Sequence, residues 1–253
     1  MCIICVKPKT SARPAADTLR EMYKRNPDGA GIAYASGGVV VLKKGLMTID
    51  EFLKAADKVP EDAPAIYHCR ISTSGGVCKE LTHPYNLAAD IKTQRQTRST
   101  WALPAVAHNG VFARFAKKDL NNDTTQFITN YLAPLQKLKT QTGGSIIDDD
   151  VAAIINELVG SSKIAILTPD GNLKMYGSYW IEDGGLSYSN ATYKPYTPPT
   201  YSYASSYYGT PRKRHDKTLY DWYEDDIFDI WDDDLASVNP AHIQSTKKTT
   251  DTK

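Results

Sequence analysis

Short apolar runs alternate with turn-forming residues over the first 190 residues, and this pattern predicts a domain rich in β-strands. The apolar run Cys2–Val6 is typical of a buried strand. Two further runs separated by Ser36-Gly37-Gly38 predict a hairpin. Strands are expected at Cys2–Val6, Gly31–Ala35, Val39–Lys43, Ala65–Ile71, Ala105–His108, Lys163–Thr168, Leu173–Tyr176, Ser178–Ile181 and Leu186–Ser189.

Helical spacing of apolar residues occurs between these strands. Thr48 and Glu51 form a capping-box pattern that predicts a helix through Asp57. A second helix is expected from a cap at Asp123 to about Leu138, with Pro134 kinking or shortening it. A third is expected at Asp149–Leu158. Helices placed between sets of strands predict an α+β fold in which helices pack against antiparallel sheets.

The composition changes near residue 190. Residues 191–253 are rich in Tyr, Ser, Thr and Pro and poor in aliphatic side chains, which predicts a disordered tail. The expected division is therefore a folded domain at 1–190 and a low-complexity tail at 191–253. Within the tail, the acidic and aromatic segment 221–234 either folds onto a partner or its own domain, or is a solvated segment with no role.

Composition and charge exclude several classes of protein. The 253 residues are 41% hydrophobic and 23% charged, with a formal net charge of +1, which argues against a generally basic nucleic-acid binder. No apolar run is long enough to span a bilayer, so a soluble, cytoplasmic protein with no membrane association is expected. Cys2-x-x-Cys5 has metal-like spacing, but no second close pair completes a zinc site, and no metal or cofactor is expected.

Cys2 is the first candidate for chemistry. Cys is small enough that the initiator Met is normally removed before it, and the chain would then begin with Cys2. A terminal Cys carries a thiol and an α-amine whose unperturbed pKa is about 7.7–8.0, so the amine can accept the thiol proton. Many ordinary proteins also have Cys at position two, so this observation alone does not identify a nucleophile.

Three further segments add polar groups at strand ends, namely Asn26–Ala33, His68–Gly75 with Thr82–Tyr85, and Ala105–Gly110 with Asp123–Thr125. Arg70 suits a carboxylate, because its planar fork binds both oxygens. Asn109-Gly110 offers a side-chain amide and a backbone N–H, the two donors of an oxyanion hole. Each also has a plain structural alternative: an ion pair for Arg70, a hairpin turn for Asn109-Gly110 and a helix cap for Asp123.

In this order, the segments resemble the class II glutamine amidotransferases, the N-terminal-nucleophile family whose glutaminase domain begins at a processed Cys. The resemblance covers about residues 2–190 and implies a stand-alone glutaminase-type domain with a four-layer α-β-β-α sandwich of antiparallel sheets. It implies Cys2 as nucleophile with its amine as base, and Asn109 and the Gly110 N–H as oxyanion donors. It also implies that Arg70, with Thr73 assisting, binds the α-carboxylate of L-glutamine, and that Asp123 binds the α-ammonium. The expected reaction forms a γ-glutamyl thioester, releases ammonia and ends in hydrolysis to glutamate.

The chain departs from the family pattern in two respects. Members often have Gly directly after the nucleophilic Cys, where this chain has Ile3-Ile4. Nothing after residue 190 resembles an acceptor domain, so a separate synthase or other acceptor-binding protein is an expected partner. Two alternatives remain open: a hydrolase of another γ-glutamyl or similar amide, and a non-catalytic binding or structural protein on the same fold.

Overall fold

The computed structural model describes residues 2–72, 76–115 and 122–195. Contacts divide the chain into one unit at Met1–Pro198 and another at Pro199–Lys253, and every described residue belongs to the first. The predictions for Thr73 and for the segment 221–234 fall outside the described residues. The described part contains no helix long and apolar enough to cross a membrane.

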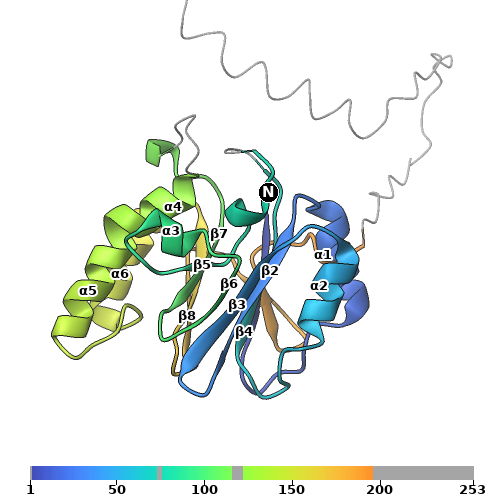
Figure 1. Cartoon of the computed structure of the whole chain (residues 1–253), viewed down its shortest axis with the longest axis horizontal. Coiled ribbons are helices and arrows are strands. Elements are labelled where there is room, and N and C mark those ends of the chain that lie inside the picture. Colours follow the sequence, from blue (N-terminus) through green and yellow to red (C-terminus); the bar gives the residue numbers. More distant parts are fainter. Residues whose placement is uncertain (1, 73–75, 116–121, 196–253) are drawn as a thin grey trace, which may run out of the picture. The chain divides into compact units, whose positions relative to one another are not determined.

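Two antiparallel sheets form the centre of this unit (Figure 1). The seven-stranded sheet has the order β10 (Ile181–Asp183), β11 (Leu186–Tyr188), β1 (Ile3–Lys7), β4 (Ala65–Cys69), β2 (Ala30–Ser36), β3 (Val39–Leu46) and β6 (Arg98–Trp101). The four-stranded sheet has the order β5 (Tyr85–Asn86), β7 (Ala105–Asn109), β8 (Lys163–Leu167) and β9 (Leu173–Tyr176). All the strand pairs are antiparallel, which confirms the mixed helix-and-strand prediction with antiparallel sheets.

Helices lie on both sides of the sheets. Figure 1 shows α1 and α2 on one side of this unit and α4, α5 and α6 on the other. The α-helices are α1 (Ala16–Arg25), α2 (Ile49–Ala56), α3 (Ile91–Gln94), α4 (Asp123–Phe127), α5 (Ala133–Gln141) and α6 (Asp149–Val159). Shorter turns are the 3₁₀ segments η1 (Lys79–Leu81) and η2 (Ala113–Phe115) and the π-helical segment η3 (Ile128–Leu132).

The strand β1 contributes to two different hydrophobic cores. Ile3 and Cys5 belong to a cluster with residues of α1 and α2. Ile4 and Val6 belong to a second cluster that includes residues of β7 and β8. Successive side chains of a strand point to opposite faces, so a run without polar interruption is what a strand buried on both faces requires. A third cluster joins the four-stranded sheet to α4, η3 and α6.

The helix α2 begins as the sequence predicts. The Thr48 side chain accepts a hydrogen bond from the Glu51 backbone N–H at 3.2 Å. The Glu51 carboxylate in turn accepts from the Met47 N–H at 2.8 Å, one residue before the cap. These bonds satisfy backbone donors that a helix start otherwise leaves unpaired.

The prediction of a helix capped by Asp123 is wrong in two details. Asn122 is the cap, and its side-chain oxygen accepts from the Thr125 N–H at 2.9 Å. The helical segment also widens into a π turn at η3, where the Ala133 N–H bonds to the Ile128 carbonyl. Pro134 has no N–H to donate, so the α-helical bonding pattern is interrupted there, although helix continues to Gln141.

Other differences concern short or highly charged elements. The strand predicted at Ser178–Ile181 begins only at Ile181, because Tyr179 is 90% exposed with a φ of 62° in the turn before it. The sequence interpretation missed α1, which buries Leu19, Met22 and Tyr23 among many charged residues. It also missed α3, β5 and β6, which have at most four residues each and give little periodic signal.

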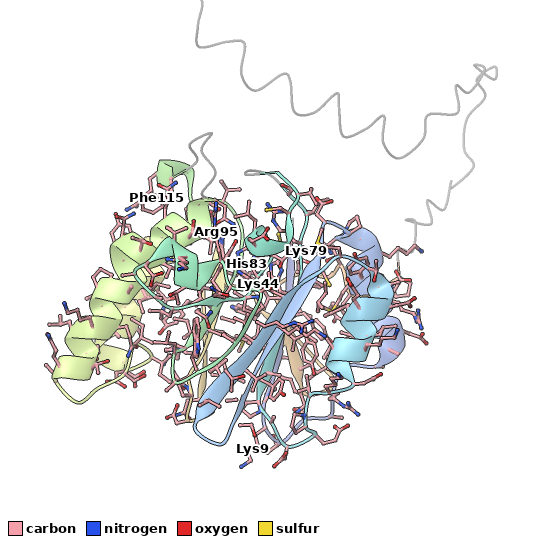
Figure 2. The ribbon with its side chains drawn as sticks, viewed as in Figure 1. Lys9, Lys44, Lys79, His83, Arg95 and Phe115 are labelled. Carbon is pink, nitrogen blue, oxygen red and sulfur yellow. The ribbon has the colours of Figure 1, made fainter. Side chains whose placement is uncertain are left out.

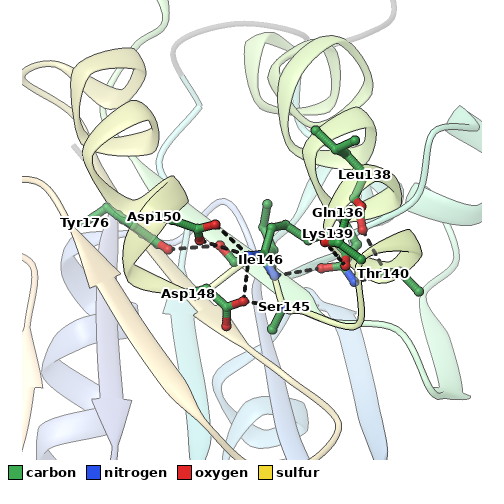
Figure 3. Close-up of polar contacts among 10 residues, drawn as sticks. Gln136, Leu138, Lys139, Thr140, Ser145, Ile146, Asp148, Asp150 and Tyr176 are labelled. Atoms are coloured by element: carbon green, nitrogen blue, oxygen red, sulfur yellow. Dashed lines mark hydrogen bonds and ion pairs between the residues drawn. The ribbon is translucent and has the colours of Figure 1, made fainter.

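Polar contacts fix the connection between α5 and α6 (Figure 3). The Lys139 ammonium lies 2.8 Å from carboxylate oxygens of both Asp148 and Asp150. The Ile146 N–H donates to the Gln136 side chain at 3.2 Å, and the Tyr176 hydroxyl donates to the Ile146 carbonyl at 3.3 Å. These bonds attach the loop between the helices to strand β9.

Candidate active site

Cys2 and Arg70 are brought together by the pairing of β1 with β4. Ile3 pairs with Cys69, so the residue before β1 lies opposite the residue after β4. The Cys2 thiol donates a hydrogen bond to the Ile71 carbonyl at 3.4 Å. Burial raises the pKa of this thiol, while the bond to Ile71 and the charge of Arg70 act in the opposite direction. The thiol is therefore protonated at neutral pH and needs a base to become a nucleophile.

The turn Asp28-Gly29 holds the chain that leaves β4. The Arg70 N–H donates to the Gly29 carbonyl and the Asp28 N–H donates to the Arg70 carbonyl, both at 2.9 Å. The Asp28 carboxylate accepts from the Ser72 N–H at 2.7 Å. Gly29 has a φ of +104°, and a Cβ there would lie 2.7 Å from a Thr82 methyl group. The sequence predicts a turn here but not its role. The hydrogen bonds show that the turn supports the backbone at Arg70.

The Arg70 guanidinium is buried beside the same loop. One of its nitrogens donates to the Gly76 carbonyl at 2.8 Å, and another donates to the Ser72 hydroxyl at 3.1 Å. Only 3% of the residue is exposed. These bonds hold the guanidinium in a defined orientation next to Cys2.

The strand β7 ends at Asn109 and Gly110. Gly110 has a φ of +138°, and a Cβ there would overlap the Ser162 side chain, so only glycine fits. The Asn109 amide donates to the Ser189 hydroxyl at 3.0 Å. An amide nitrogen has two N–H groups, so this bond leaves the second for another acceptor.

Asp123 lies at the start of α4. Its carboxylate accepts from the Phe112 N–H at 2.8 Å and from the Thr124 N–H at 2.9 Å. Burial raises the pKa of this carboxyl, and the two backbone bonds oppose that shift. The result is a buried carboxyl group fixed by main-chain donors.

One pocket collects these groups. Its walls are formed by Cys2, Arg70, Ile71, His83, His108, Gly110, Asn122, Asp123 and Thr124. Four of the six predicted site residues, namely Cys2, Arg70, Gly110 and Asp123, therefore meet there. Asn109 precedes Gly110 in the chain and is not part of the wall, and Thr73 is outside the described residues. The water-accessible volume is about 20 Å³, room for about one water molecule.

His83 and His108 form part of the pocket wall, a role that the sequence analysis does not predict for them. The Thr124 hydroxyl lies 2.8 Å from His108 Nδ1 and 3.2 Å from His83 Nε2. The rings of His83 and His68 also pack against each other in a tilted arrangement, with centroids 4.4 Å apart. His83 lies near the middle of this unit (Figure 2). Burial lowers the pKa of His68 and His108 to about 3 and lowers that of His83 as well. All three rings are neutral at pH 7.

Ser189 and Asn190 are further residues that the sequence interpretation missed. The Ser189 hydroxyl accepts from the Ile4 N–H at 2.9 Å in addition to Asn109. The Asn190 amide donates to the Cys2 carbonyl at 2.7 Å. Both residues lie beside the start of β1 because β11 pairs with β1. No local pattern marks them, since their role depends on a contact between distant parts of the chain.

Within the described residues, no three His, Cys, Asp or Glu side chains are arranged to hold a metal ion. Cys5 and Cys69 are buried free thiols, and Cys2 and Cys78 are partly exposed free thiols. The polar groups of the pocket are thus a thiol, a cation, a carboxylate, neutral imidazoles and hydroxyl or amide donors.

Comparisons with known proteins give limited matches. No family model and no curated protein matches this chain. Among solved structures, it is similar to glutamine phosphoribosylpyrophosphate amidotransferase from B. subtilis, complexed with ADP and GMP, with 20% identity and a TM-score of 0.37 over 67% of this chain and 35% of that chain. A second match, described as the allosteric regulatory enzyme of purine biosynthesis, has 20% identity and a TM-score of 0.35 over 67% of this chain and 36% of that one. The chain thus spans about a third of the length of the solved structures it matches.

Proposed function

We propose that this protein is a glutamine amidotransferase of the N-terminal-nucleophile type, in which Cys2 attacks the side-chain amide of glutamine. The observation that carries the proposal is the meeting of Cys2, Arg70 and Asp123 in the wall of one pocket. A thiol suits attack on an amide carbon, and a guanidinium with a carboxylate suits the two charges of an α-amino acid.

Each charged group matches one end of the substrate. The Arg70 fork binds the α-carboxylate, and the Asp123 carboxylate binds the α-ammonium. The uncharged amide of glutamine then reaches toward Cys2, whose thiol shares the pocket with both. The Gly76 carbonyl and the Ser72 hydroxyl, which both accept hydrogen bonds from Arg70, hold the guanidinium in place for this role.

The base is the α-amine of Cys2 after removal of Met1. The pocket imidazoles are poor candidates, because burial raises the pKa of the Cys2 thiol while burial lowers the pKa of His83 and His108. Transfer of the thiol proton to such a ring is uphill. An α-amine has an ordinary pKa of about 7.7–8.0 and accepts the proton far more readily.

The reaction then has two steps. The thiolate of Cys2 adds to the amide carbon, the C–N bond breaks, and the nitrogen leaves as ammonia with the proton that the amine received. A water molecule then adds to the thioester, breaks the C–S bond and releases glutamate. The second Asn109 N–H and the Gly110 N–H stabilise the oxyanion in both steps, which typically accelerates a reaction by about 10²–10³ for each donor.

The four-layer α-β-β-α arrangement of N-terminal-nucleophile hydrolases is part of this proposal. Three hydrophobic clusters support it: one with α1 and α2, one with residues of both sheets, and one with α4, η3 and α6. Such an arrangement places the ends of β1, β4 and β7 near one another, where the pocket lies.

The test is the intact mass of the full chain after incubation with a diazoketone analogue of glutamine. We expect loss of Met1 and addition of one analogue, blocked by excess glutamine and absent in Cys2→Ala. Cys78→Ala is the matched control, since Cys78 is the other partly exposed thiol, and it should still be labelled once. Retention of Met1, or labelling that survives in Cys2→Ala, would show the proposal to be wrong.

A further inference from the structure

A second groove runs between the end of helix α2 and the edge strand β6. Its volume is about 480 Å³, which lies within the range of small-molecule sites. It shares no lining residue with the Cys2 pocket. Figure 1 shows α2 beside the sheet that contains β2 and β3. The strand β6 pairs with β3 and forms one edge of that sheet. The proposed glutamine reaction does not use this groove.

The floor of the groove consists of two cross-strand rows on one face of the sheet. Ile32 pairs with Lys43, and Lys43 pairs with Arg98. In the neighbouring row, Tyr34 pairs with Val41 and Val41 pairs with Thr100. The rows lie two residues apart along the strands, a distance of about 6.6 Å. The groove is therefore cationic at one row and carries an aromatic ring, an aliphatic side chain and a hydroxyl at the next.

The pairing of Lys43 with Arg98 is unfavourable by itself. Like charges directly opposite each other on neighbouring strands lower the stability of a sheet. Lys58, which follows the end of α2, adds a third positive charge, and the groove has no acidic lining residue among the described positions. None of these three cations forms an ion pair with a described carboxylate. A bound anion would relieve the repulsion among these three side chains.

We propose that this groove binds a phosphomonoester that carries a planar ring. The phosphate lies between Lys43 and Arg98, where two cations from neighbouring strands reach the same oxygens. The ring lies over Tyr34 and Val41 in the next row, within the length of a small phosphorylated molecule. Lys58 closes the phosphate end from the helix side. The groove volume suits one such molecule.

Phenyl phosphate is the probe that tests the arrangement, because it contains only the two proposed groups. Titration of the full ¹⁵N-labelled chain followed by NMR should shift the Lys43, Arg98 and Tyr34 amides with a Kd of about 1 mM or lower. Inorganic phosphate and phenol, each alone, should bind at least about tenfold more weakly, since each occupies only one row. Equal affinity of inorganic phosphate and phenyl phosphate would overturn the proposal.

Charge reversal separates loss of binding from loss of folding. Lys43→Glu places opposite charges at the Arg98 pair, so the folded state should become more stable while phenyl phosphate binding falls at least about tenfold. Lys9→Glu is the control, because Lys9 is exposed, lies outside the groove and is drawn at the lower end of the molecule in Figure 2. Binding that survives in Lys43→Glu, or that is lost equally in Lys9→Glu, would overturn the proposal. The test does not involve Cys2, so its result is independent of the amidotransferase proposal.

Discussion

The side-chain amide of Asn109 donates a hydrogen bond to the hydroxyl of Ser189 at a distance of 3.0 Å. Both residues are buried, and Ser189 also accepts the N–H of Ile4 in the strand that follows Cys2. Ser189 therefore connects the proposed oxyanion donor with the strand that carries the proposed nucleophile. A small hydroxyl fixes the orientation of the amide and the position of β1 relative to β7.

The first prediction concerns this contact. Ser189→Ala removes the acceptor for two buried N–H groups, so kcat for glutamine hydrolysis should fall by at least about tenfold with little change in KM. The substitution should also lower the free energy of unfolding by about 1–3 kcal/mol. Steady-state kinetics and urea unfolding measure the two effects. Ser11→Ala, which alters an exposed hydroxyl bonded to Gly185, should change neither, and a rise in KM at constant kcat would contradict the positioning role.

The second prediction concerns the Arg70 fork. Arg70→Lys keeps the positive charge but loses the planar pair of donors, so kcat/KM for glutamine should fall by at least about tenfold. 4-Aminobutanamide, which is glutamine without its carboxylate, should react poorly with the native enzyme and no worse with this variant. Measuring both substrates with both proteins forms a cycle. If the variant lost the same factor on both substrates, Arg70 would be supporting the fold and not binding the carboxylate.

The third prediction concerns Asp123 and pH. Burial raises the pKa of this carboxyl, so it becomes neutral at a higher pH than an exposed Asp does and then holds the α-ammonium less well. The kcat/KM for glutamine should therefore fall as the pH decreases through that raised pKa. Glutaramate, the analogue without the α-amine, should lack this limb of the profile, as should Asp123→Asn with glutamine. A limb of equal size for both substrates would assign it to another group.

The sequence predicts those elements whose pattern is local. The uninterrupted run Ile3–Val6, the Thr48 cap and the helix at α6 are each determined by neighbouring residues, and each is found in the structure. The cap at α4 shows the limit of such reasoning. Asn122 and Asp123 are both good cap residues, and the choice depends on the Phe112 N–H, which engages the Asp123 carboxylate from outside the helix.

In the candidate site, too, the residues that belong to local motifs are predictable, and those that depend on distant contacts are not. Cys2, Arg70 and Asp123 were identifiable because each has a distinctive side chain within a motif, and the pocket contains all three. Ser189 and Asn190 were not identifiable, because an ordinary Ser and Asn become important only when β11 pairs with β1. The small volume of the pocket also has no signature in the sequence, since it results from packing of five separate segments.

The last prediction concerns the three buried histidines. One ring nitrogen in each of His68, His83 and His108 has no hydrogen-bond partner among the described residues, and protonation would bury a charge there. Burial lowers the pKa of His68 and His108 to about 3, and lowers that of His83, whereas an unfolded His has a pKa of about 6.5. As the pH falls below 6.5, the unfolded chain binds protons that the folded chain does not. The stability that the neutral rings contribute is complete above this pH and is lost towards pH 3.

The free energy of unfolding should accordingly decrease between pH 7 and pH 5 by up to about 1.4 kcal/mol per pH unit for each histidine. Asp123 acts in the opposite direction because burial raises its pKa, but it is one group against three. Urea unfolding at a series of pH values measures the slope. His108→Asn should reduce this slope by the amount that corresponds to one proton. Val159→Ala, a core truncation in α6, should instead lower the free energy of unfolding equally at every pH. An unfolding free energy that stays constant from pH 7 to pH 5 would mean that these rings bind protons in the folded protein as readily as in the unfolded chain.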